Sequence, residues 1–161
     1  MTDTLFPDLR DPRVRFARLV EALAQRIGQS LDASDGMVVL VDDTQALKLV
    51  VELATAEDRA FAVLPFLAIP DDIPRAGEIA GRLLQINADR AALAGATICA
   101  DGGRGQYCLV LQISLDAEPV DFVRAIEELT DLGETVRAAV LDDVAAPPRP
   151  EIGLPAFFQR A

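Results

Sequence analysis

Three apolar, strand-like runs lie between residues 37 and 69 and are separated only by short polar turns. The runs are MVVLV, ALKLVVEL and RAFAVLPFLAI, and the turns between them are DDTQ and TAED. Strands joined by such short turns pair antiparallel, because a parallel pair needs a much longer crossover connection. In the middle run, apolar residues at 47, 49, 51 and 53 alternate with Lys48, Val50 and Glu52, which indicates one core face and one mostly polar face. Pro65 cannot donate to a ladder, so the third strand is expected to end there or to lie at a sheet edge.

The sequence on either side of these runs is typical of amphipathic helices. Residues 11–28 begin with Asp11 and Pro12, which favour a helix start, and end with Gly28, which favours a helix stop. A second helix is predicted over residues 70–93, with Pro74 in its first turn, and a third from about residue 116, with Pro119 near its start. The runs ATICA and QYCLVLQISL between these two helices are strand-like.

The resulting order is helix-strand-strand-strand-helix-strand-strand-helix. It predicts an α+β fold with a mostly antiparallel, twisted sheet and helices that bury apolar stripes. We expect residues 13–141 to form this domain, after an N-terminal extension of residues 1–12. Residues 142–161 are rich in proline and show no periodicity, so they are predicted to be a flexible tail. Phe157 and Phe158 of this tail dock either on the protein's own surface or on a partner.

The stretch DGGRGQ, between the last two strand-like runs, holds three glycines in four positions. A phosphate-binding P-loop needs Lys and then Ser or Thr after its last glycine, and a dinucleotide-binding loop must open a helix. Here RGQYCL follows Gly103, Cys108 occupies the third glycine position of the dinucleotide pattern, and a strand follows. The stretch is therefore predicted to be a hairpin turn, in which glycine permits a positive φ.

The composition excludes most of the usual kinds of catalytic site. The chain has no His and two cysteines, which removes the usual zinc sites, histidine general bases and Ser-His or Cys-His nucleophile pairs. Neither a catalytic residue, a metal site nor a cofactor is predicted, and an enzyme that uses only carboxylates, such as Asp71 with Glu78, is a minor alternative. Cys99 and Cys108 flank the hairpin turn nearly symmetrically, so they are either small core residues or a redox pair.

The chain is strongly acidic, with 26 acidic against 15 basic residues and a net charge of −11 at pH 7. Such a field repels nucleic acids and anionic membranes, so we expect neither as a partner and consider a basic polypeptide instead. No stretch has the roughly 18 uncharged apolar residues of a membrane helix, and the N-terminus lacks the pattern of a signal peptide. A cytoplasmic location is expected, and the apolar content of 51% leaves surface to meet a protein partner.

From about residue 13 to 141 the sequence resembles the class I chaperones of type III secretion, the Tir-chaperone (CesT-like) family. The resemblance is clearest from residue 83 to 115. There a helix containing LLQIN leads through the apolar segment GAT into a hairpin, and the strand LVLQ and a last amphipathic helix follow. The resemblance rests on the combination of all these elements, in order and at natural lengths.

The resemblance implies a cytoplasmic homodimer without catalytic activity that binds the N-terminal segment of one or more secreted effectors. Such proteins hold this segment non-globular and help to present it to the export ATPase. In the family the second helix generally lies at the dimer interface, which would explain why its apolar stripe here is wider than one sheet contact requires. The alternative is that Leu84 or Ile86 packs under a loop. The implied interface residues are Ile79, Leu83, Leu84 and Ile86.

Effector segments in the family fill apolar surface patches and partly add a strand to the sheet. Around the first helix and the third strand, the corresponding residues belong either to such a patch or to the core. The implied effector-binding patch consists of Phe16, Val20, Phe61, Val63 and Leu64. The main alternative function is that of a regulatory or adaptor protein of the same fold, which binds a folded partner rather than an export cargo. The proline-rich tail, which many family members lack, is either an extra docking element or only disordered.

Overall fold

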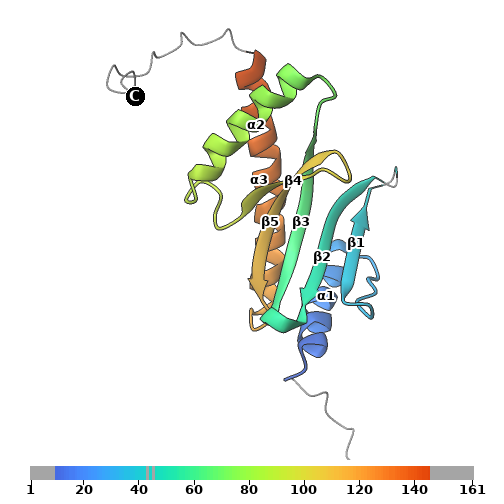
Figure 1. Cartoon of the computed structure of the whole chain (residues 1–161). Helices are drawn as coiled ribbons and strands as arrows, with labels where there is room; N and C mark the ends of the chain where they lie inside the picture. The colour runs from blue at the N-terminus through green and yellow to red at the C-terminus, as the bar shows by residue number, and fades with distance from the viewer. Residues whose placement is uncertain (1–9, 43, 45, 146–161) are drawn as a thin grey trace, which may run out of the picture.

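The computed structural model describes residues 10–42, 44 and 46–145. The helices are α1 (Pro12–Ile27), α2 (Ile73–Ala88) and α3 (Pro119–Ala145), with a 3-10 turn at Thr55–Glu57. The strands are β1 (Met37–Val41), β2 (Leu47–Ala54), β3 (Arg59–Ala68), β4 (Thr97–Asp101) and β5 (Gln106–Ser114). They form an antiparallel sheet in the order β1-β2-β3-β5-β4 (Figure 1). The predicted α+β fold and the predicted order of elements are confirmed.

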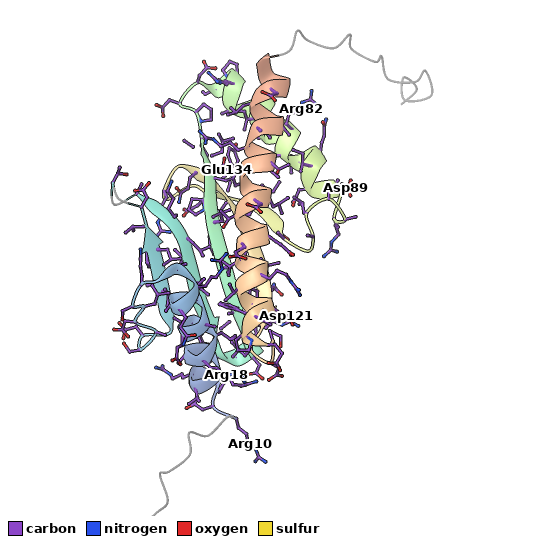
Figure 2. All side chains as sticks on the ribbon, turned by 180° about the vertical axis from the view of Figure 1, so that it is seen from behind. Arg10, Arg18, Arg82, Asp89, Asp121 and Glu134 are labelled. Carbon is purple, nitrogen blue, oxygen red and sulfur yellow. The ribbon has the colours of Figure 1, made fainter. Side chains whose placement is uncertain are left out.

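Two helices, α1 and α3, lie on one side of the sheet. α1 and α3 cover the face that we call the inner face, and they lie behind the strands in Figure 1 and in front of them in Figure 2, which is seen from behind. Side chains that point to these helices, such as Val51, Ala62 and Leu109, are fully buried. We call the opposite side of the sheet the outer face, and neither α1 nor α3 covers it. α2 packs against α3 and β4 near one end of the sheet (Figure 1).

Side-chain caps set the starts of the first two helices. The side chain of Asp11 accepts the backbone N–H of Arg13 at 2.8 Å, and that of Asp72 accepts the backbone N–H of Arg75 at 2.9 Å. These bonds satisfy N–H groups that have no partner inside the helix. α1 ends at Gly28, which has the left-handed φ of 71° that glycine adopts without strain.

Two helix ends differ from the prediction. α2 ends at Ala88 rather than near residue 93, because Asp89 accepts the N–H of Ala92 and starts a turn. This turn places Leu93 in the core, where it is 1% exposed. α3 continues to Ala145, past the expected domain boundary at residue 141. The remainder of the expected tail lies outside the described residues.

β3 does not end at Pro65, and it is not an edge strand. It continues to Ala68 and lies between β2 and β5. The prediction that this strand ends at Pro65 or lies at an edge of the sheet was therefore wrong. Locally, however, an edge exists. β2 pairs with β3 only as far as Val63, so beyond that residue one side of β3 faces no strand in the described chain.

The hydrogen bonding of β4 explains why proline is tolerated in β3. The N–H of Ile98 donates to the side-chain oxygen of Asn87 on α2, so it points away from β5. In an antiparallel ladder hydrogen-bonded and non-hydrogen-bonded pairs alternate, so Cys108 turns its backbone groups toward β4. Pro65, which lies opposite Cys108 on the other side, is therefore in a pair without hydrogen bonds. The N–H that proline lacks would point to the open side of β3.

Candidate protein-binding surfaces

A row of four valines, continued by a threonine on the fifth strand, crosses the outer face. Residues directly opposite each other on neighbouring strands have their side chains on the same face of a sheet. Successive residues of a strand point to opposite faces, and the chain neighbours Val51 and Ala62 are buried on the inner face. The row, which we call the valine row, consists in strand order of Val39, Val50, Val63, Val110 and Thr97.

The outer face is most exposed at β1. Met37, Val39 and Val41 are 47%, 46% and 43% exposed, so every outward side chain of this strand is a large apolar group in contact with water. β1 is also an edge of the described sheet, and one row of its backbone N–H and C=O groups has no strand partner there. This strand therefore offers apolar side chains and free backbone groups together.

The five residues of the expected effector-binding patch do not share one surface. Phe61 and Val63 lie half-buried on the outer face, opposite Glu52 and Val50 of β2, which separates them from the exposed side chains of β1. Phe16 and Val20 belong to the core beneath α1, where they are 0% and 2% exposed. Leu64 points to the inner face and is 7% exposed. The structure thus brings Phe61 and Val63 together and separates them from the other three.

A cleft of about 460 Å³ opens beside β3, where β2 no longer pairs with it. Leu64 lines this cleft, so a residue that is almost buried still contributes to a hollow in the surface. At the rim Arg26 of α1 forms an ion pair with Glu127 of α3 at 2.7 Å. The apolar lining from α1, β3 and α3 includes Leu23, Ile27, Phe66 and Ile126.

The outward side of α2 is apolar and flat. Leu84 is 70% exposed and Ile73 is 83% exposed. Gly77 and Gly81 lie between them at helical spacing, and a Cβ added at either glycine would meet nothing within 4 Å. A glycine inside a helix costs about 1 kcal/mol relative to alanine, so two such residues weaken α2 without any packing reason in the described chain.

The residues expected at the dimer interface divide between two surroundings. Ile79 and Leu83 are 1% and 3% exposed and belong to the chain's own core. Ile86 is partly buried against the same core. Leu84 alone among the four is exposed, and it shares the flat side of α2 with the two glycines. The wide stripe therefore consists of a core-facing part and an outward part.

Within residues 10–42, 44 and 46–145 there is no group of three or more His, Cys, Asp or Glu side chains that could hold a metal ion. Asp71 and Glu78, the pair considered for acid–base chemistry, are both exposed.

The glycine-rich stretch forms the turn between β4 and β5, where Asp101 accepts the N–H of Arg104 at 3.1 Å and Gly105 has a φ of 63°. No described helix is both long enough and apolar enough to span a membrane.

The acidic residue with the most perturbed pKa has a structural role. The hydroxyl of Thr44 donates to the carboxylate of Asp42 at 2.6 Å, and the backbone N–H of Ala46 donates to the same oxygen at 3.0 Å. These bonds, together with Lys48 at 3.2 Å, hold the pKa of Asp42 well below its usual value. Asp42 thereby stabilises the turn between β1 and β2.

The valine row on the open face of the sheet and the exposed apolar side of α2 are features typical of protein-binding surfaces. The sequence model of the Tir chaperone protein (CesT) family matches residues 18–137, and the chain belongs to this family. The resemblance expected from the sequence is confirmed. No curated protein is similar enough in sequence to count as a relative.

Solved structures with the same fold include three two-protein complexes. In the HopA1–SchA chaperone–effector complex, the match has 19% identity and a TM-score of 0.61, and it covers 78% of this chain and 95% of that chain. The ExsC–ExsE complex gives 23% identity and a TM-score of 0.62, with 83% and 97% covered. The ExoU–SpcU complex of the type III secretion system of Pseudomonas aeruginosa gives 23% and 0.53, with 73% and 93% covered. At these sequence identities the matches show that the fold is shared.

Sequence reasoning placed Leu84 at an outward surface of α2, but it missed the exposed residues of β1 and the two glycines beside Leu84, although the sequence carried a signal for both. The run MVVLV does not alternate with polar residues as β2 does, which is unusual for an edge strand with one face in water. Gly77 and Gly81 interrupt an otherwise helical pattern four residues apart. Neither signal says which partner covers the surface.

Proposed function

We propose that this chain is a cytoplasmic chaperone of a type III secretion system, which binds the N-terminal segment of one or more secreted effectors and keeps it non-globular for export. Membership of the Tir chaperone family supports this class of function. The carrying observation is the valine row beside the free edge of β1. An extended effector segment adds a strand to β1 and places alternate side chains beside Met37, Val39 and Val41.

This mode of binding keeps the effector segment unfolded for a physical reason. Backbone groups that pair with β1 are not available for the segment's own secondary structure, and apolar side chains held on the outer face are not available for its own core. The chaperone performs no covalent chemistry in this proposal. Its net charge of −11 favours a basic cargo segment over an acidic one, and the secretion ATPase is a further partner that receives the complex.

The proposed functional unit is a homodimer joined through α2. Leu84 and Ile73 supply exposed apolar area, and Gly77 and Gly81 let the backbone of a second α2 approach closely. Ile79 and Leu83 act in the interface only indirectly, because they hold α2 on its own core. Ile86, which is half-buried, lies at the border of the two surroundings.

Substitution of Leu84 tests the dimer without damage to the fold. Leu84→Asp places a charge on an exposed position, so the chain should fold normally and elute as a monomer in size-exclusion chromatography with light scattering. Val120→Asp, at a position of α3 that is 72% exposed, is the matched control and should remain a dimer. Leu83→Asp is unsuitable, because it would put the charge into the core. If the Leu84→Asp protein stays dimeric, α2 does not form the dimer interface.

Cargo binding is tested with the tagged full chain purified from its native host. The proposal expects exported proteins to copurify and to be protected from protease only near their N-termini. Val39→Glu should reduce their recovery at least about tenfold, because it buries a charge against the cargo, whereas Val120→Glu should not. Recovery of a folded regulatory protein, with no exported protein, would instead identify the chain as an adaptor. Equal recovery by both variants would exclude β1 as the binding strand.

A further inference from the structure

The two cysteines of the chain lie directly opposite each other on neighbouring strands. Cys99 of β4 pairs with Cys108 of β5, in a register that runs without a shift from Thr97 and Val110 to Asp101 and Gln106. Both side chains therefore lie on the outer face, next to the valine row. Both are free thiols, and Cys99 is exposed whereas Cys108 is 3% exposed.

The Cα separation of the two residues lies within the range of a disulfide. Since Ile98 donates its N–H to Asn87, away from β5, the next pair in the ladder, Cys99 with Cys108, is a hydrogen-bonded one. Cα atoms in such a pair are about 5.5 Å apart, inside the range of about 4.4–6.8 Å that disulfides span. The Cβ atoms of opposite residues are about 4.5–5.5 Å apart, and the longer distances belong to hydrogen-bonded pairs. The two Cβ atoms must therefore approach by roughly 1–1.5 Å, which strains the bond and makes it easier to reduce.

We propose that Cys99 and Cys108 form a reversible intramolecular disulfide when the protein meets a hydroperoxide, and that this bond locks the edge strand β4 onto β5. The two thiols have different roles because their surroundings differ. Cys99 is the one that solvent and peroxide reach. Burial raises the pKa of the Cys108 thiol, with Asp101 and Cys99 adding to the effect, so the Cys108 thiol is less ionised than an ordinary thiol. Cys99, which is exposed, therefore reacts first and Cys108 second.

The reaction has two balanced steps. The Cys99 thiolate attacks one oxygen of hydrogen peroxide, an S–O bond forms as the O–O bond breaks, and the released hydroxide takes up a proton to give water. The sulfur of Cys108 then attacks the sulfenic sulfur of Cys99. The S–S bond forms as the S–O bond breaks, and the leaving hydroxide takes the Cys108 proton as a second water. Two thiols lose two electrons and two protons in total, and one peroxide is reduced to two waters. A thiol such as glutathione reverses the bond by exchange.

The bond would act on a strand that pairs with another strand on one side only. β4 is the edge of the described sheet opposite β1, and its contacts are with β5 and α2. A disulfide between β4 and β5 prevents the two strands of this hairpin, which turns at residues 101–106, from separating locally. Amide hydrogen exchange in β4 should therefore slow on oxidation, while exchange in β1, at the other edge, should not change.

Peptide mapping of the full-length protein tests the bond directly. Trypsin cleaves after Arg90, Arg104 and Arg124, so Cys99 and Cys108 fall in separate peptides, residues 91–104 and 105–124. After treatment of the reduced protein with hydrogen peroxide, the expected result is an intact mass lower by two hydrogen atoms and a linked pair of these peptides. Treatment with glutathione should separate them again.

Variants assign the roles of the two thiols. Cys108→Ser should leave a sulfenic acid on Cys99 that dimedone traps, and Cys99→Ser should react slowly at most. A matched control, the double variant Thr97→Cys with Cys99→Ser, keeps an exposed thiol on the same face but moves it to a diagonal position about 7–8 Å from Cys108, where no bond should form. Free alkylation of both cysteines after peroxide treatment of the original protein, or chains linked only to one another through Cys99, would overturn the proposal.

Discussion

The inner and outer faces of β1 carry similar side chains in different surroundings. Val38 and Val39 are chain neighbours on β1, yet Val38 is 3% exposed beneath the helices and Val39 is 46% exposed on the other side. Burial of a valine contributes about 1.5–3 kcal/mol, so the inner valine already stabilises the fold. At Val39 most of this contribution would be gained only if another chain covered the side chain. The difference shows that the two faces of one strand contribute unequally to the stability of the isolated chain.

The largest expected difference comes from truncating these two neighbours. Val38→Ala should lower the free energy of unfolding by about 2 kcal/mol, since it removes buried methyl groups and leaves a cavity. Val39→Ala should change it by less than about 0.5 kcal/mol, since its side chain is largely in water. Urea denaturation of the isolated protein measures both. Equal losses would mean that the outer face is as well packed as the inner face, and the comparison would fail.

Two glycines sharpen the comparison between a packed and an open surface. A Cβ at Gly133 of α3 would lie 2.5 Å from Cδ2 of the buried Leu64, so Gly133→Ala must displace that side chain and should destabilise the fold by about 1 kcal/mol even after the gain in helix propensity. Gly81→Ala meets nothing and should stabilise the fold by about 0.5–1 kcal/mol. The same Gly81→Ala protein should dimerise less tightly, which analytical ultracentrifugation measures. A destabilised Gly81→Ala would show that α2 has no free side.

The smallest effect is expected in the turn that joins β1 to β2, which belongs to neither face. The pKa of Asp42 is depressed in the folded protein, so its bonds to Thr44 and Ala46 stabilise the fold at neutral pH and above the unfolded value of 3.8. This stabilisation is lost as the pH falls from 3.8 toward the lower folded pKa. Asp42→Asn should therefore be slightly less stable at pH 7 and less sensitive to acid below pH 3.8, as thermal melts at several pH values would show. Parallel pH profiles of the two proteins would contradict this role.

The elements of the fold were predictable because their signals are local. Asp11 and Asp72 bind N–H groups within their own helix starts, and the glycines before β5 shape their own turn. Such interactions span a few residues, so the sequence pattern contains them. Membership of the chaperone family was predictable for a related reason, since it follows from the order and lengths of these elements.

The surfaces were less predictable because burial depends on neighbours distant in sequence. Helical spacing groups Leu83 with Leu84, but only the packing of α2 on α3 decides that one is buried and the other exposed. Similarly, Phe16 and Val20 belong to an apolar stripe in either interpretation, and the sheet beneath α1 places both in the core. The continuation of β3 through Pro65 required knowledge of where β2 stops pairing.

Pro65 also bears on how such a protein avoids aggregation. An apolar strand with free backbone groups is a template on which further strands can stack without limit. On the open side of β3 the missing N–H interrupts that template, so a strand from another molecule cannot continue the β2 ladder past this point. The cleft beside it remains accessible to side chains. The sheet can therefore present apolar surface to unfolded chains and still resist polymerising with them along β3.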